Sequence, residues 1–280
     1  MKYKIALAQI APVLGKIEDN LEKHEFYLKK AREEKVDLVV FPELSLTGYE
    51  LMDLVPDVAL TLESPQIKEL KNLSKLTSFF SGFVLEEKGI FYNVAALFHK
   101  GEIIHLHKKV FLPNYSMFEE RRFFAEGSSF RSFDFKGARF AISICYDYLH
   151  PSSSYVYFLQ KTEILVVMSA SPARVLNDQG FWSIKGWEDM SSVVSRFFNM
   201  YVIYVNRAGF EGGMGFAGAS HLFDPFGNML VKLKEFEEDY ATVEIDTEEV
   251  RRSRILFPAL RDERPEVIFK EIKKVLENEN

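Results

Sequence analysis

Cys145 is the only cysteine of this sequence and its best candidate for a nucleophile. It follows the apolar segment 141–144 and precedes the polar segment Tyr146-Asp147-Tyr148, so we expect it at the end of a strand. A sole cysteine forms neither an internal disulfide nor a multi-thiolate metal site, which leaves core packing or thiolate chemistry as its uses. The strand-end position favours chemistry.

A reacting thiol needs a base to activate it and a cation or amide to hold the charge on an attacked carbonyl. Glu43, in Phe41-Pro42-Glu43-Leu44, is a candidate base, and Lys109 is a candidate cation. Each residue also has an ordinary interpretation when taken alone. Cys145 would then pack in the core, Glu43 would be a solvated helix start, and Lys109 would be a surface lysine beside Lys108.

The elements that must position these residues alternate between strands and helices, which indicates an α/β fold. Apolar patterns predict strands at 4–10, 37–41, 79–85, 91–98, 102–106, 129–135, 138–144, 164–168, 201–205, 216–223 and 229–233. Helical spacing predicts helices at 18–35, 65–77, 155–159 and 182–199. Hairpin turns are expected at Lys100-Gly101 and Lys136-Gly137.

The composition predicts a single domain over residues 1–280, with residues 250–280 as a charged C-terminal extension that ends in a helix. Apolar residues make up 47% of the chain and include 26 phenylalanines, which is enough to fill a large core. Residues 113–128 read as a long loop rich in charged and aromatic side chains. Loops of that length inside a compact domain tend to be functional.

The charge distribution argues against some classes of partner. The net charge is −6 and the lysines are spread among acidic residues, so nucleic acid is not an expected partner. The first residues have too short an apolar run for a signal peptide, and no stretch approaches the roughly 18 apolar residues that a membrane span needs. We therefore expect a cytoplasmic protein with a reduced thiol.

The order and local context of Glu43, Lys109 and Cys145 resemble the Glu-Lys-Cys triad of the nitrilase superfamily of carbon–nitrogen hydrolases. Phe-Pro-Glu, Lys-x-x-Leu-Pro and a cysteine followed by an aromatic or acidic residue and Asp are each similar to that family's signatures. Further similarities are Phe118-x-Glu120-x-Arg122, Ser169-Ala170-Ser171-Pro172, Val205-Asn206-Arg207 and Arg261-Asp262-Glu263-Arg264-Pro265. The resemblance covers nearly the whole chain.

This resemblance implies a four-layer α-β-β-α sandwich in which the triad meets at the bottom of a pocket, with no metal or organic cofactor. It also implies homodimers in which outer helices pack together and the C-terminal tail crosses to the neighbour. We expect that interface on the helices after Cys145 and at 182–199. The second of these carries much large apolar surface, from Trp182, Trp187, Met190, Val193, Val194, Phe197 and Phe198.

The resemblance also implies roles for individual residues. Glu43 would be the base, Cys145 would form a thioester, and Lys109 with the backbone N–H of Tyr146 would hold the oxyanion. Glu120 matches a second carboxylate that orients the lysine and the substrate, although a shift of one residue would put Glu119 in its place. Further oxyanion-binding or substrate-binding candidates are Tyr115, Ser169, Ser171 and Asn206.

The implied reaction is hydrolysis of an amide or N-carbamoyl group of a small molecule, with release of ammonia or an amine. The run from Lys109 to Tyr115 is similar to the glutaminase domain of glutamine-dependent NAD synthetase, so a glutaminase subunit that supplies ammonia to a separate synthetase is one alternative. The tail at 261–265 is similar to standalone amidases instead. A nitrilase and a non-catalytic scaffold or binding protein are the remaining alternatives, and the physiological substrate stays open.

Two other patterns carry weaker functional hypotheses. His105 and His107 would lie on one face of a strand as a metal pair, but no third ligand is evident nearby. The glycine-rich segment 209–218 lacks the Lys-Ser/Thr pair of a phosphate-binding loop and is more typical of a turn.

Overall fold

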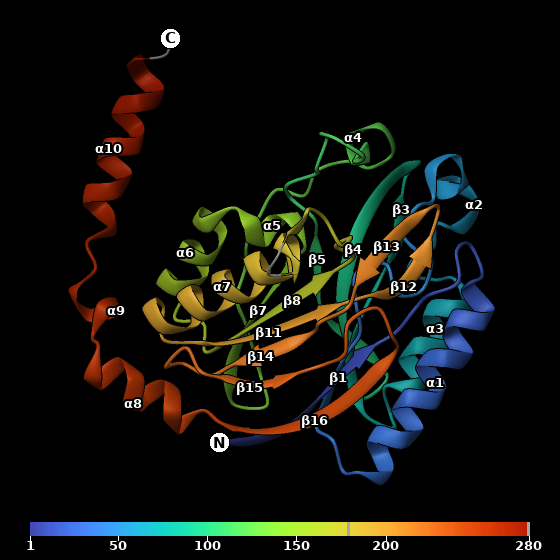
Figure 1. Ribbon diagram of the computed structural model, residues 1–280, viewed down its shortest axis with the longest axis horizontal. Helices are drawn as coiled ribbons and strands as arrows, with labels where there is room; N and C mark the ends of the chain where they lie inside the picture. The colour runs from blue at the N-terminus through green and yellow to red at the C-terminus, as the bar shows by residue number, and fades with distance from the viewer. Residues whose placement is uncertain (178–179, 279–280) are drawn as a thin grey trace.

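The computed structural model describes residues 1–177 and 180–278. Two six-stranded sheets lie face to face, and helices cover the outer face of each sheet (Figure 1). The α/β class and the four-layer α-β-β-α sandwich that the sequence predicts are therefore confirmed. Residues 279 and 280 of the expected C-terminal extension lie outside the described residues.

The first sheet has strands in the order β16-β1-β2-β3-β4-β5. Its central strands β1, β2 and β3 are parallel, and the remaining neighbours are antiparallel. The strands are β16 (Asp239–Asp246), β1 (Lys2–Gln9), β2 (Leu38–Val40), β3 (Ser78–Glu87), β4 (Ile90–His99) and β5 (Glu102–Lys108). Helices α1 (Ile17–Glu33) and α3 (Pro65–Leu73) cover its outer face.

The second sheet has the order β15-β14-β11-β8-β7-β6, with β7, β8 and β11 parallel. Its strands are β15 (Met229–Lys232), β14 (His221–Phe223), β11 (Tyr201–Asn206), β8 (Ile164–Ser169), β7 (Ala138–Ile144) and β6 (Phe133–Phe135). Its outer face is covered by α5 (Tyr146–Leu149), α6 (Pro151–Leu159) and α7 (Trp182–Phe197).

The layers follow from the alternation of side chains along each strand. In β1, Ile5 and Leu7 point into the core between the sheets, whereas Ala6 and Ala8 lie under α1 and α3. In the second sheet, Val166 faces the same central core, and its neighbours on β8 pack under α6 and α7. The strands buried on both faces therefore read as continuous apolar runs.

The two predicted lysine-glycine turns are present. Both residues of Lys100-Gly101 have positive φ, 49° and 90°, and those of Lys136-Gly137 have φ of 47° and 86°. Two consecutive positive φ values define the turn whose twist matches that of a β-hairpin, and glycine adopts such values without strain.

Some predicted boundaries were wrong. The expected strand 216–223 is broken at Gly218 and Ala219, which have φ of 61° and 52°. Its first part belongs to β13 (Met214–Ala217), which pairs with β12 (Ala208–Glu211) in a separate two-stranded ribbon. The chain turns between these two strands inside the glycine-rich segment 209–218, where a turn was expected. The strand β16 was not predicted, and the loop 113–128 contains the short helix α4 (Glu120–Phe123). The other short elements are η1 (Met52–Leu54), α2 (Val55–Val58) and the ribbon of β9 (Leu176–Asn177) with β10 (Gly180–Phe181).

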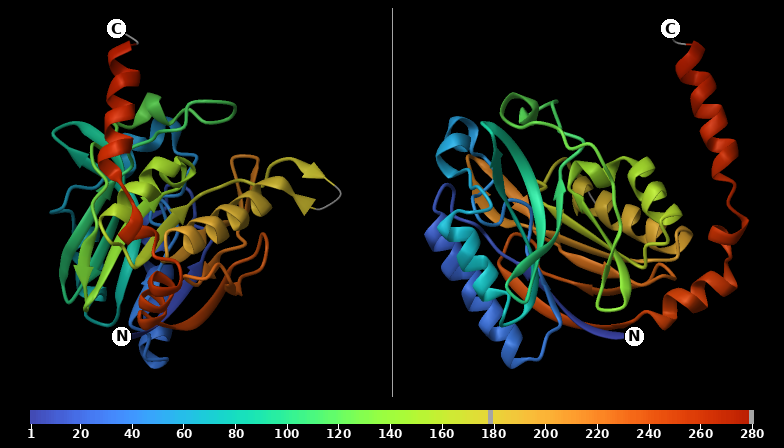
Figure 2. Two further views of the ribbon diagram at one scale, coloured as in Figure 1. Left: turned by 90° about the vertical axis from the view of Figure 1, so that its left-hand side faces the viewer. Right: turned by 180° about the vertical axis from the view of Figure 1, so that it is seen from behind.

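The C-terminal segment consists of α8 (Glu248–Leu256), α9 (Ala259–Asp262) and α10 (Pro265–Asn278). The start of α8 belongs to the body, because Val250 is buried in the core between the sheets. In contrast, α10 stands away from the rest of the molecule, as Figure 1 and the right-hand view of Figure 2 show. Its apolar side chains are exposed, including Val267, Ile268, Phe269, Ile272 and Val275.

The large apolar residues of α7 are divided between two environments. Trp187 and Val194 pack against the second sheet, whereas Trp182, Val193 and Phe197 are 63%, 54% and 53% exposed. Among the described residues, no helix combines the length and the apolar character needed to cross a bilayer.

We expect a homodimer in which α6, α7 and the C-terminal segment bury these exposed apolar side chains. Light scattering at micromolar concentration should give about twice the 32.4 kDa of one chain. Removal of the residues after Arg264 should shift the protein toward the mass of a single truncated chain, and Val250 should stay in the core. A full-length chain that scatters as a monomer would contradict the interface, and an unchanged dimer after truncation would contradict the role of α10.

Candidate functional site

Glu43 lies at the turn that follows β2 and is buried, with an exposed fraction of 1%. Its Oε1 accepts hydrogen bonds from Lys109 Nζ at 2.7 Å and Asn93 Nδ2 at 2.8 Å, and its Oε2 accepts one from the N–H of Ala170 at 2.8 Å. The turn lies directly against β3, since a Cβ on Gly82 would be 2.5 Å from the nitrogen of Leu44. These contacts fix the carboxylate in a dry site.

Lys109 follows β5, and its side chain is fully buried. Its Nζ donates to Glu43 Oε1 and to Glu120 Oε1, both at 2.7 Å. Its backbone N–H donates to the carbonyl of Asn93, and its carbonyl accepts from Gly127 at the end of the long loop. Three segments far apart in the sequence therefore meet at one ammonium group.

The structure answers the question of register between the two neighbouring glutamates. Glu120 points inward to Lys109, whereas the side chain of Glu119 is 54% exposed and lies 3.6 Å from Arg122. The loop 113–128 is thereby tied to the site, as the sequence predicts. Neighbouring Lys108 instead reaches outward to Glu87.

The charges of the cluster shift the ionisation of its members. Burial lowers the pKa of Lys109, but the carboxylates of Glu120 and Glu43 outweigh burial and hold it well above its ordinary value. Burial raises the pKa of Glu120 to about 7, although Lys109 acts in the opposite direction. The ammonium is thus a permanent cation.

Cys145 lies between β7 and α5, at a strand-to-helix turn with φ of 44° and ψ of −101°. Such a backbone conformation is strained for a residue with a Cβ, and strain of this kind is common at active sites. The residue as a whole is partly exposed, whereas its thiol group is buried. Burial and then the carboxylate of Glu43 raise its pKa, and Lys109 acts against this rise. The resting group is therefore a thiol whose proton must move before it can attack.

Asp147 fixes the nucleophile turn, a role that was not predicted. Its Oδ1 accepts hydrogen bonds from the N–H groups of Val110 at 2.9 Å and Phe111 at 2.8 Å, just after Lys109. Its Oδ2 accepts from His107 at 2.8 Å and from the N–H of Ile144 at 3.3 Å. One buried carboxylate therefore joins the segment of Lys109 to the segment of Cys145.

The contact with Asp147 gives His107, one of the two histidines of the predicted metal pair, a structural partner instead of a metal. His107 is buried and paired with Asp147, while His105 stacks on Phe133 with ring centres 4.0 Å apart. Within residues 1–177 and 180–278, no group of three or more His, Cys, Asp or Glu side chains could hold a metal ion. The metal-pair hypothesis thus gains no third ligand.

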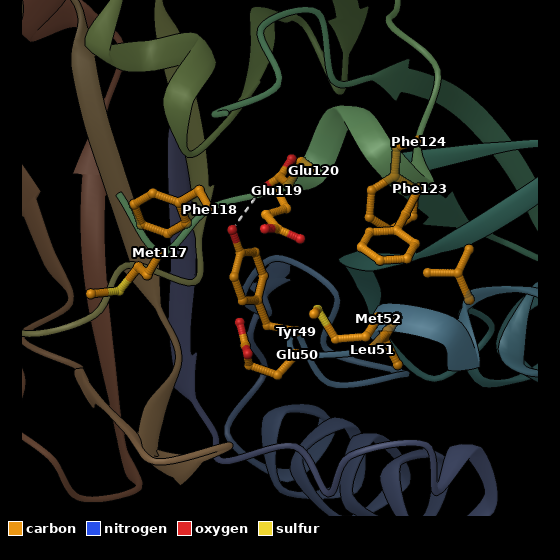
Figure 3. Close-up of a pocket in the computed structure, with 11 residues that line it drawn as sticks. Tyr49, Glu50, Leu51, Met52, Met117, Phe118, Glu119, Glu120, Phe123 and Phe124 are labelled. Carbon is orange, nitrogen blue, oxygen red and sulfur yellow. Dashed lines mark hydrogen bonds between the residues drawn. The ribbon is translucent and has the colours of Figure 1, made fainter. Parts of the chain in front are cut away.

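Tyr49 was also missed by sequence reasoning. Its hydroxyl donates to Glu120 Oε1 at 2.7 Å, as the dashed line in Figure 3 marks. Its backbone N–H and that of Glu50 both donate to Glu211 Oε1 at 2.8 Å, and Glu211 pairs with the buried Arg207. The cavity drawn in Figure 3, beside Tyr49 and Glu120, has a volume of about 30 Å³. That is far below the roughly 300 Å³ of small ligand sites, so no substrate fits behind Glu120.

The remaining predicted residues fall into two groups. Ser169, Ser171 and Asn206 are buried, and the amide of Asn206 bonds to the backbone of Ser171 at 2.7 and 3.1 Å and to the carbonyl of Gly218 at 3.1 Å. Asn206 therefore holds the segment after β8 in place. Ser169 Oγ accepts a hydrogen bond from the hydroxyl of Tyr204 at 3.4 Å, and Ser169 acts to lower the pKa of the Cys145 thiol.

Tyr115 and Tyr146 lie on the accessible side of the site. Tyr115 is 42% exposed, and its ring centre lies 5.5 Å from that of Tyr146. The N–H of Tyr146 is the first of α5 and has no partner within its own helix, which suits it to hold a negative oxygen. The arrangement thus offers a thiol, a carboxylate, a fixed ammonium and a free backbone donor, the set that acyl transfer needs.

One signal in the sequence could have identified Asn93 and Asp147 as residues of the site. Asn93 interrupts the apolar run of β4, and Asp147 follows an apolar strand by three residues; buried polar side chains in such places need partners. Tyr49 gives no such signal, because a tyrosine can also lie with its hydroxyl in solvent, and only burial makes a hydrogen-bond partner necessary.

Comparison with known proteins adds independent findings. The family model for carbon-nitrogen hydrolase matches residues 4–255. A glutamine-dependent NAD(+) synthetase of Aquifex aeolicus is 32% identical over 90% of this chain and 44% of its own length, and a nitrilase of Pyrococcus abyssi is 27% identical over 95% and 99%. The chain spans about half the length of the synthetases it matches.

A solved carbon-nitrogen hydrolase from Helicobacter pylori has the same fold, with a TM-score of 0.85 at 23% identity over 95% of this chain and 97% of that one. The match of the family model over most of the sequence agrees with the resemblance drawn from Glu43, Lys109 and Cys145. The chain belongs to the carbon–nitrogen hydrolases of the nitrilase superfamily.

Proposed function

We propose that this protein hydrolyses the amide or N-carbamoyl bond of a small molecule through a thioester on Cys145. The observation that carries the proposal is the buried Lys109 ammonium, held at 2.7 Å by both Glu43 and Glu120 beside the strained turn of Cys145. A buried charge is costly unless it is paired and hydrogen-bonded, and such an arrangement beside a thiol suits catalysis more than stability.

In the first half of the reaction, Glu43 takes the proton of Cys145 while the sulfur attacks the carbonyl carbon. Lys109 Nζ and the N–H of Tyr146 stabilise the negative oxygen that forms. Glu43 then gives its proton to the leaving ammonia or amine, the carbon–nitrogen bond breaks, and the acyl group remains on sulfur as a thioester.

In the second half, Glu43 removes a proton from water, and the water oxygen attacks the thioester. The carbon–sulfur bond breaks, the thiol regains its proton from Glu43, and the acid is released. Glu120 keeps Lys109 oriented throughout. No step needs a metal or an organic cofactor, and a cytoplasmic setting would keep Cys145 reduced.

A glutaminase that supplies ammonia to a separate synthetase is the second candidate. It is favoured by the identity of 30% and 32% to two glutamine-dependent NAD(+) synthetases, each matched over 90% of this chain. The purified protein should be screened against glutamine, other ω-amides, N-carbamoyl amines and simple nitriles with ammonia as the readout. A strong preference for glutamine favours the glutaminase, and no turnover of any compound contradicts both candidates.

Replacement of Cys145 by alanine should leave the fold intact and lower kcat at least about 1,000-fold, because the covalent step is lost. Circular dichroism checks the fold. Intact-mass spectrometry of the wild type during turnover should show the acyl adduct, and the variant should show none. Retention of more than a few per cent of the activity would refute Cys145 as the nucleophile.

Glu43→Gln and Lys109→Met should each lower kcat by about 100-fold or more while changing KM little, because base and oxyanion cation act mainly in the transition state. Lys108→Met is the matched control, since Lys108 is adjacent and points to Glu87. A change confined to KM in either triad variant would show that the assigned roles are wrong.

Tyr49→Phe should move the acidic limb of the pH profile of kcat/KM to higher pH. Burial raises the pKa of Glu120 to about 7, and the hydrogen bond from Tyr49 opposes that rise. Loss of this bond leaves the ionised carboxylate less stable, so its pKa increases and activity is lost at a higher pH on acidification. Tyr115→Phe is the control, and an unmoved limb in Tyr49→Phe would contradict a role for ionised Glu120.

A further inference from the structure

Arg174 is a cation beside Tyr115 and Phe118, and the reaction described above does not use it. Its guanidinium lies 5.9 Å from the ring centre of Tyr115 and 5.8 Å from that of Phe118. Burial raises the pKa of Tyr115, nearby Tyr146 and Cys145 add to the rise, and the positive charge of Arg174 acts against it. The ring centre of Tyr115 also lies 5.5 Å from that of Tyr146, so Tyr115 contacts both Arg174 and the residue that follows Cys145.

The backbone of Arg174 is fixed by two other elements. Its N–H donates to Ser183 Oγ at 2.9 Å, and the N–H of Ser183 donates back to its carbonyl at 3.4 Å, at the start of α7. The preceding Ala173 donates to the carbonyl of Gly215 on β13 at 2.8 Å. The side chain is thus held in position by its own backbone and by two aromatic rings.

The net charge of the site indicates what a cation at the position of Arg174 would do. Two carboxylates, Glu43 and Glu120, surround the single ammonium of Lys109, so the ionised cluster is net negative and repels an anionic substrate. Arg174 makes no ion pair with any residue of 1–177 or 180–278. A surface hollow of about 360 Å³ is lined by Asn114, Tyr115, Ser116, Phe118, Glu119 and Arg122. Arg174 reaches this hollow through the rings of Tyr115 and Phe118, which it contacts.

We propose that Arg174 binds a carboxylate of the substrate, which makes the substrate a small amide or N-carbamoyl compound that also bears an acid group. This inference rests on the proposed function and narrows its substrate class. The guanidinium presents parallel N–H donors that match a carboxylate, and stacking against aromatic rings keeps its plane fixed.

The test compares glutaramate, which has an amide at one end and a carboxylate at the other, with valeramide, which lacks the carboxylate. The wild type should prefer glutaramate. Arg174→Gln should lower kcat/KM for glutaramate by about tenfold to a hundredfold, the effect of losing a charged hydrogen bond, mainly through KM. Valeramide should change by less than about twofold, and Arg174→Lys should restore part of the loss because it keeps the charge.

Arg121→Gln is the matched control, because Arg121 lies on the same loop but is exposed and pairs with Glu126 at 3.5 Å. It should leave both substrates unchanged. An equal loss for glutaramate and valeramide in Arg174→Gln would show a structural role and overturn the inference. A wild type without preference for glutaramate would overturn it as well.

A second measurement separates this inference from the proposed function. If the wild type hydrolyses neither compound, the proposed function fails for these amides, and binding decides the role of Arg174. Calorimetry with Cys145→Ala should then show glutaramate binding that is weaker by about tenfold or more when Arg174→Gln is added. Equal affinity in the two proteins, or no binding to Cys145→Ala, would overturn the inference.

Discussion

The buried ammonium of Lys109 is the constraint on which the rest of the site depends. Its side chain is fully buried and bonds to Glu43 and Glu120 at 2.7 Å each. Loss of either carboxylate would leave a charge in a dry interior with half of its compensation, which costs several kcal/mol in such settings. The turn after β2, the end of β5 and helix α4 must therefore all be in place before the lysine can be buried.

A second carboxylate performs a comparable task for the backbone. Asp147 accepts from Val110, Phe111 and His107, and so binds the chain beyond Lys109 to the turn of Cys145. The positions of cation and sulfur are thereby coupled through one side chain that does not itself touch the thiol proton. Tyr49 couples Glu120 to Glu211 and the buried Arg207 in the same way. The site is held by polar contacts between layers. Within the described part of the chain, Glu120 Oε2 and Asn93 Oδ1 are nevertheless buried without a hydrogen-bond partner.

Much of this could be read from the sequence, because the signals were local. Continuous apolar runs marked β2, β8 and β11, and the lysine-glycine pairs marked two hairpin turns. The inward position of Glu120 followed from its place in a motif. In contrast, β16 has no strong apolar run, since it lies at the edge of its sheet and most of its residues are only partly buried. Its place beside β1 depends on pairing between residues more than 200 positions apart, which no local pattern reveals.

The predicted strand at 216–223 failed for a related reason. Both of its halves are apolar and extended, and the break at Gly218 and Ala219 serves the packing of two separate sheets. Asn206 shows that the partners of a single polar residue are equally hard to predict from the sequence. Its type and motif suggested contact with a substrate, whereas its amide is used by the backbone of Ser171 and Gly218. Residue type predicts the capacity to form hydrogen bonds, and only the fold determines with what.

The pairing of β1 with β16 has a consequence for how the molecule is made. Lys2 faces Asp246 and Gln9 faces Asp239 in this antiparallel pair, so β1 receives one of its two neighbours only after residue 246 has left the ribosome. Until then one side of β1 is a row of unpaired backbone groups, the kind of edge that recruits strands from other chains. During synthesis this edge of β1 is therefore open to aggregation until β16 emerges, and chaperones that shield exposed edges would act in that interval.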